Sequence, residues 1–180
     1  MLGSGPSRLS LLGFAMPRIA ALIFVLLLGA CYQVEGDTVP ASASIRVEGV
    51  RDGLYRRPDG VEVQLRWNAA ERYYDVTAKD GPGGKARAAR LASGLYLVQY
   101  TDAARLTLMA SLQGEEMVLF APTKAAEQRL LKAHGLGLRP GPISSLTGPA
   151  GSVANFFKDL AASGEYEEAA RMVPVKSSAR

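Results

Sequence analysis

The sequence has little of the chemistry on which most metal and redox sites depend. Its 180 residues include one cysteine, Cys31, and one histidine, His134. A single cysteine excludes an intrachain disulfide, and a single histidine excludes metal sites built on a histidine pair. The spacing of the acidic residues matches no zinc or calcium loop. We therefore expect neither a metal nor a cofactor.

Strong net charge is also missing. The chain carries 21 Lys and Arg against 17 Asp and Glu, which gives a formal net charge of +4. Two of the positive charges, Arg8 and Arg18, precede Cys31, whereas every acid follows it. The part after Cys31 thus has a net charge near +2. This excludes the concentrated basic face that is typical of nucleic-acid binding, so we expect no nucleic-acid partner.

Long apolar runs are scarce, and the clearest one lies near the N-terminus. Residues 19–28 are ten apolar residues without a charge. A bilayer-spanning helix needs about 20 such residues, so this run is too short to span. Its length suits the apolar core of a signal peptide, and Arg18 supplies the positive flank. Met16-Pro17-Arg18 also resembles a translation start site. The sequence therefore leaves both Met1 and Met16 as candidate first residues.

The end of this run carries a specific motif. Leu28-Gly29-Ala30-Cys31 resembles the lipobox of bacterial lipoproteins. The resemblance implies a signal peptide over residues 1–30, cleavage before Cys31, and acyl chains on that cysteine that hold the protein on the periplasmic side of a membrane. In lipoproteins of enteric bacteria, an Asp directly after the cysteine tends to keep the protein at the inner membrane. This chain has Tyr32 at that position, so the resemblance implies the outer membrane. The alternatives are an N-terminal membrane anchor and an ordinary signal peptide with an incidental cysteine.

The part after Cys31 divides into a tether, a domain and a tail. Residues 31–42 contain Gly36 and Pro40 and no periodicity, which predicts a flexible tether. Residues 43–172 are expected to form a single β-rich domain, and residues 173–180 a frayed tail. Alternating apolar residues over 61–67 predict the clearest strand. Further strands are expected at 45–47, 74–76, 85–91, 95–100, 106–112 and 117–120.

The pattern then changes to helical. Thr123 is a suitable cap for a helix over 124–134 that ends at Gly135. We expect a loop over 136–151, a second helix capped by Ser152, and a third over 165–172. The predicted fold is mainly β (α+β). It is an antiparallel meander of about seven short strands, curled into a sandwich or partial barrel, with two or three C-terminal helices.

One short internal match accompanies these strands. Gly53-Leu54-Tyr55 recurs as Gly94-Leu95-Tyr96, and in each case an alternating strand follows. The match suits two similar β-units packed about a pseudo-twofold axis. Chance is the alternative, because the match is three residues long.

The candidate sites are few. His134 lies at a predicted helix end, where the dipole favours a cation, and no nucleophile or orienting acid accompanies it, so we predict no catalytic residue. Basic residues surround residues 80–84 and are candidate contacts to an anionic surface; the alternative is solvated charge that protects a sheet edge. These residues are Lys79, Lys85, Arg87 and Arg90.

Together these features predict a membrane-tethered periplasmic lipoprotein, with Cys31 as the site of lipid attachment. Its role is expected to be non-enzymatic binding of an envelope protein or a small apolar ligand. The alternatives are a structural lipoprotein that binds peptidoglycan and an enzyme that acts on envelope components.

Overall fold

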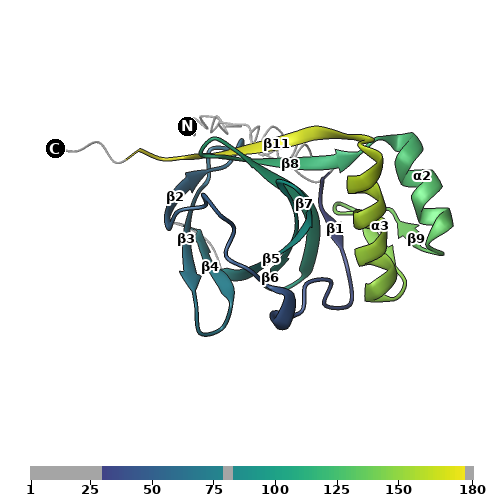
Figure 1. Cartoon of the computed structure of the whole chain (residues 1–180), viewed down its shortest axis with the longest axis horizontal. Helices are drawn as coiled ribbons and strands as arrows, with labels where there is room; N and C mark the ends of the chain where they lie inside the picture. The colour runs from purple at the N-terminus through teal and green to yellow at the C-terminus, as the bar shows by residue number, and fades with distance from the viewer. Residues whose placement is uncertain (1–29, 79–82, 177–180) are drawn as a thin grey trace, which may run out of the picture.

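The computed structural model describes residues 30–78 and 83–176. Its centre is a closed antiparallel barrel of eight strands, with two helices packed on one side (Figure 1). Around the barrel the strands follow the order β6-β5-β4-β3-β2-β11-β8-β7, and β7 pairs with β6 to close the ring. The barrel strands are β2 (Gly53–Arg56), β3 (Glu62–Asn68), β4 (Tyr73–Ala78), β5 (Gly84–Ala92), β6 (Leu95–Thr101), β7 (Arg105–Gln113), β8 (Glu116–Pro122) and β11 (Tyr166–Pro174).

The period-2 pattern of β3 shows why this sequence forms a barrel wall. Val63 and Leu65 are buried inside, whereas Gln64 between them is exposed. The turn before β3 is closed by a hydrogen bond from the Arg57 N–H to the Val61 carbonyl, at 2.9 Å. Gly60 adopts a φ of 82° in that turn, a conformation that glycine accepts without strain. The mainly β class is confirmed. The strands close into a complete barrel of eight, where we expected about seven in a sandwich or partial barrel.

The last barrel strand, β11, covers the residues for which we expected a third helix, so that expectation is wrong. Residues 166–172 pair with β8, and Val173 and Pro174 pair with β2. Ala, Glu, Arg and Met favour a helix locally, but two open strand edges supply backbone partners along this segment. A register shift between Glu168 and Ala170 also interrupts the alternation that signals a strand.

The barrel consists of two consecutive groups of four strands. The first group is β2 to β5, and the second is β6, β7, β8 and β11. The two groups meet where β5 pairs with β6 and where β2 pairs with β11. The short internal match falls on the first strand of each group, and Tyr55 and Tyr96 are both buried in the barrel interior.

The interior of the barrel is filled by side chains and by the segment of residues 45–50. Val47 and Val50 of that segment are buried among interior residues of the strands. The backbone N–H of Val47 donates to the Tyr74 hydroxyl at 2.8 Å. Figure 1 shows the chain running from η2 (Ala41–Ala43) across the front of the barrel toward β2. The strand expected at 45–47 is therefore wrong, because this segment packs inside the barrel.

A second core lies outside the barrel wall, beneath the helices α2 (Lys124–Ala133) and α3 (Ala150–Ser163). The cap of α2 is confirmed, because the Thr123 side chain accepts a hydrogen bond from the Ala126 N–H. In α3, Pro149 rather than Ser152 is the N-terminal flanking residue. Neither helix is long and apolar enough to cross a membrane, within the described part of the chain.

The segment after Cys31 is packed on the barrel, so the expected tether is wrong for residues 32–39. Tyr32 and Gln33 form β1, which pairs with Thr107 and Leu106 of β7. Val34 and Val39 are buried in the outer core. On its other side β1 pairs with β10 (Ser145–Thr147), which pairs with β9 (Gly137–Arg139). Two short strands thus lie inside the loop expected over 136–151.

Candidate functional site

The predicted lipid-attachment residue, Cys31, lies directly before β1 and is half-buried. Burial raises the pKa of its thiol to about 11, although the positive charge of Arg57 partly opposes this. A thiol with such a pKa is protonated at neutral pH and is therefore a weak nucleophile. The thiol is therefore expected to be more reactive in the unfolded chain than in the folded domain.

Tyr32 anchors the chain immediately after this cysteine. Its ring makes edge contacts with Phe156 and Phe157 of α3, with centroids 6.1 and 6.0 Å away. Its hydroxyl donates a hydrogen bond to Glu127 of α2. Tyr32 is only 3% exposed. The packed part of the chain therefore follows Cys31 directly, with no spacer between them.

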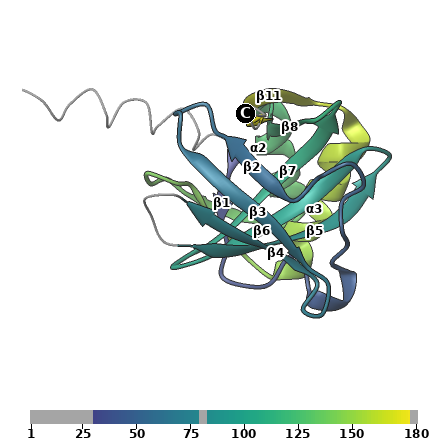
Figure 2. The same ribbon diagram turned by 90° about the vertical axis from the view of Figure 1, so that its left-hand side faces the viewer.

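Two loops flank Cys31. The β2–β3 turn contributes Arg57, whose guanidinium pairs with Asp59 at 2.7 Å. The β9–β10 hairpin lies beside β1, because β10 pairs with β1 and the Gln33 N–H donates to the Ser144 carbonyl at 2.9 Å. Figure 2 shows the β2–β3 turn and this hairpin extending toward the same side of the molecule, on the left of the view.

The candidate basic cluster is not brought together as one surface. Lys79 lies outside the described residues. Lys85 and Arg87 point outward from β5, and the Lys85 ammonium lies 4.5 Å from the Tyr73 ring centre. Arg90 faces the other side of the strand, 5.4 Å from the ring centre of its cross-strand neighbour Tyr96.

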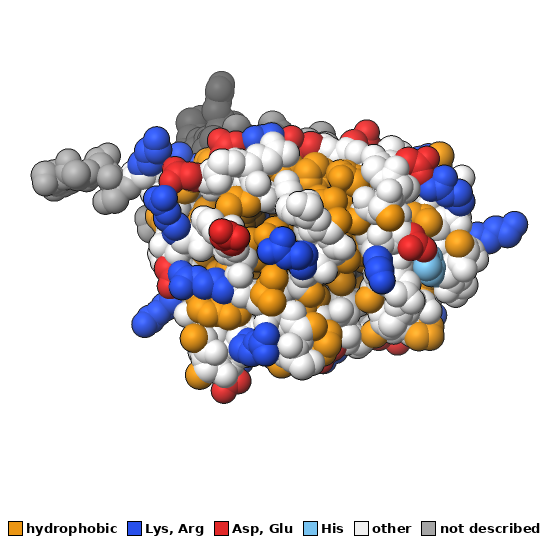
Figure 3. Space-filling view, in the orientation of Figure 1, with side chains coloured by type: hydrophobic (Ala, Val, Ile, Leu, Met, Phe, Trp, Pro, Cys, Tyr) orange, Lys and Arg blue, Asp and Glu red, His pale blue; other side chains and the backbone are white. Residues whose placement is uncertain are grey.

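The charge on the front face of the molecule is mixed. Figure 3 shows basic and acidic side chains scattered over this face, with apolar side chains visible between them. Because positive and negative side chains are mixed on this face, it has no strong electrostatic potential of one sign. Charge alone would therefore not attract a highly charged partner to it.

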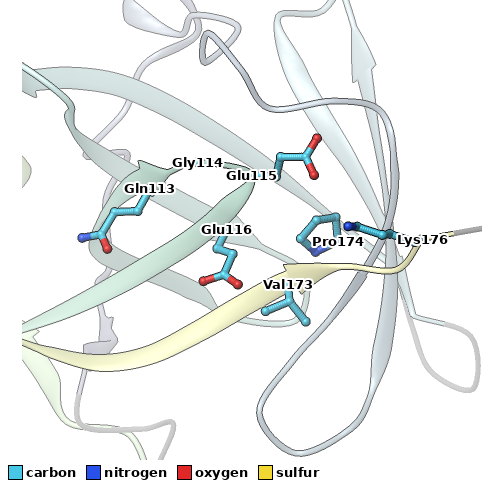
Figure 4. Close-up of a pocket in the computed structure, with 7 residues that line it drawn as sticks. All are labelled: Gln113, Gly114, Glu115, Glu116, Val173, Pro174 and Lys176. Atoms are coloured by element: carbon cyan, nitrogen blue, oxygen red, sulfur yellow. The ribbon is translucent and has the colours of Figure 1, made fainter.

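Two open depressions lie at the end of the barrel that holds the β7–β8 turn. One is bounded by residues 113–116 of that turn and by Val173, Pro174 and Lys176 (Figure 4). Its two acids are in ion pairs: Glu115 with Arg51 at 3.1 Å, and Glu116 with Arg171 at 2.5 Å. Each of these two carboxylates therefore has a guanidinium as its neighbour.

Among the site residues predicted from the sequence, Cys31 is the one that lies half-buried directly before β1 and near a basic side chain. The direct packing of Tyr32 and the nearby Arg57 were not foreseen. The alternation of Tyr32 and Val34 was a signal for β1, but Gly36 and Pro40 obscured it. Comparison with protein-family models, curated proteins and solved structures finds no match for this chain.

Proposed function

We propose that this protein is a lipoprotein of the bacterial envelope, anchored through acyl chains on Cys31. The supporting observation is the position of the chain's single cysteine, which combines the lipobox spacing with a place immediately before β1. Cleavage between Ala30 and Cys31 would leave every strand of the described residues in place. Each buried methylene of an acyl chain contributes about 0.8 kcal/mol, so two or more chains would hold the barrel firmly on a membrane.

We further propose that the anchored barrel is a non-enzymatic binding protein whose partner is another envelope protein. The packed interior favours surface recognition over storage of a small apolar ligand inside the barrel. Tyr55, Tyr74 and Tyr96 occupy that interior together with Val47 and Val50. A tether suits a surface binder, because confinement raises the effective concentration of both partners.

The anchor is tested by metabolic labelling with radioactive palmitate. We expect label in the wild-type protein and in Ser44→Ala, and none in Cys31→Ala. Ser44→Ala is a matched control, because it also replaces a small side chain in the N-terminal part of the chain. Label that persists in Cys31→Ala would overturn the proposal.

The binding role is tested by crosslinking in intact cells. The lipidated protein is compared with a soluble exported Cys31→Ser form. We expect one envelope protein to be captured by the lipidated form and much less of it by the soluble form. Crosslinking to no protein, together with co-sedimentation on purified sacculi, would instead indicate a peptidoglycan-binding protein.

A further inference from the structure

We infer that the end of the barrel around Cys31 lies directly against the membrane, with residues 57–61 and 139–143 in contact with lipid headgroups. We call these two loops the membrane rim. The inference rests on the proposed lipid anchor and adds an orientation to it, because a lipoprotein on a flexible tether would have no fixed face toward the bilayer.

The first argument is the absence of a spacer. One extended residue spans at most about 3.6 Å, and Tyr32 is already fixed by Phe156, Phe157 and Glu127. Acyl chains on Cys31 must enter the bilayer, so the adjacent wall of the barrel is drawn to the headgroups with them. A long tether would have allowed the body to stand away from the membrane.

The second argument is the chemistry of the loops beside Cys31. Val61 in the β2–β3 turn is 40% exposed, the largest exposure among the big apolar side chains described. The hairpin tip carries exposed Pro140 and Pro142, preceded by exposed Arg139. Apolar side chains beside a basic group suit the boundary between acyl chains and anionic headgroups.

The acids of the rim do not oppose this contact. Asp59 pairs with Arg57 at 2.7 Å, and Glu62, which follows the turn, pairs with Arg56 at 2.8 Å. The negative charge of each carboxylate is thus balanced by a neighbouring guanidinium. An unbalanced carboxylate here would have been repelled by anionic lipid.

This orientation assigns the opposite end of the barrel to the partner. The β7–β8 turn and the depression of Figure 4 lie at that end. With the rim on the membrane, Glu115 and Lys176 would face the periplasm.

In the lipidated protein the thiol of Cys31, the chain's single cysteine, is blocked by the lipid. An introduced cysteine is then the sole free thiol, and it is labelled with the environment-sensitive dye NBD. Lipidated Val61→Cys, Pro142→Cys and Glu115→Cys proteins are placed in phosphatidylethanolamine–phosphatidylglycerol vesicles with a headgroup-region nitroxide lipid. Circular dichroism checks that each variant is folded, and vesicle flotation checks the anchor.

We expect the nitroxide lipid to remove most of the emission at positions 61 and 142 and little of it at 115. Equal quenching at 61 and 115, or no quenching at 61 in protein that floats with the vesicles, would overturn the orientation while leaving the anchor intact. Wild-type protein that does not float would overturn the anchor itself, and the orientation with it. A soluble Cys31→Ser, Val61→Cys protein is the control and should show no quenching.

Discussion

The side-chain oxygen of Gln99 accepts a hydrogen bond from the backbone N–H of Val39 at 2.9 Å, and both residues are buried. The same oxygen accepts from the Thr38 hydroxyl at 3.1 Å, and the Gln99 amide donates to Asp37 at 3.1 Å. A single glutamine of β6 thus holds three successive residues of the N-terminal segment on the outside of the barrel wall.

Gln99→Leu is expected to release this segment. The substitution leaves the buried Val39 N–H without its acceptor, which costs about 1–3 kcal/mol of stability. Hydrogen exchange should become faster at residues 32–39, and chemical denaturation should show the loss. Gln64→Leu is the matched control, because that glutamine is exposed on β3. Equal losses in the two variants would contradict the role given to Gln99.

Phe156→Ala is expected to weaken the outer core severely. Phe156 is fully buried and contacts both Tyr32 and Phe157. Truncation of a buried phenylalanine costs about 3–5 kcal/mol, a large part of a typical domain's stability. Denaturant unfolding measures the loss, and Asn155→Ala on the exposed side of α3 should change stability little. A loss below 1 kcal/mol for Phe156→Ala would contradict the described packing of α3.

Gly49→Ala tests whether residues 45–50 pack inside the barrel. An added Cβ would lie 2.4 Å from a Leu112 methyl, and the φ of 86° adds backbone strain. Gly60→Ala is the control, since it has a similar φ of 82° and open space around it. We expect Gly49→Ala to be the more destabilising of the two by about 1 kcal/mol or more. Leu112→Ala should relieve part of that excess in the double variant, and strict additivity would contradict the contact.

The unlipidated thiol of Cys31 is expected to react slowly in the folded domain. Its pKa is raised to about 11 from 9.0, so the reactive thiolate is about 100-fold rarer at pH 8 than in the unfolded chain. Iodoacetamide should therefore modify a soluble, leaderless form about 100-fold more slowly than the urea-unfolded form. Glu115→Cys in a Cys31→Ser background provides the exposed control. Rates for Cys31 that match those of this control would contradict the burial.

Stability is expected to fall at alkaline pH, partly because of Tyr32. Burial, and then the hydrogen bond to Glu127, raise the pKa of the Tyr32 hydroxyl well above its ordinary value near 10. The unfolded chain releases this proton above about pH 10 while the folded chain keeps it, so rising pH favours unfolding. The contribution of Tyr32 to the free energy of unfolding is present in full below pH 10 and declines above it. Tyr32→Phe should lower stability at pH 7 and flatten the decline above pH 10, as urea titrations would show; parallel pH profiles would contradict the assignment.

Much of the barrel wall was predictable because its strands alternate in the sequence. The segment around Val63 and Leu65 is one example, and the two four-strand groups follow the order of the chain. The closing strand β11 was not predictable, because its composition favours a helix and its register shift hides the alternation. Pairing partners that are distant in the sequence decided its conformation.

The candidate residue could be named from the sequence, but its surroundings could not. Four consecutive residues that resemble a lipobox point to Cys31. The fixed position of Tyr32 depends on Glu127, Phe156 and Phe157, which lie 95 to 125 residues later in the chain. No local pattern near Gly36 and Pro40 carries that information.

The pairing of β2 with β11 would set the order of events during the proposed export. Tyr55 of the first barrel strand pairs with Pro174 of the last, so the ring stays open until almost the whole chain is available to fold. The phenylalanines that bury Tyr32 also arrive late. If Cys31 is lipidated as we propose, the modifying enzyme would therefore meet an accessible cysteine throughout translocation, and the finished fold would then bury the residue that it had modified.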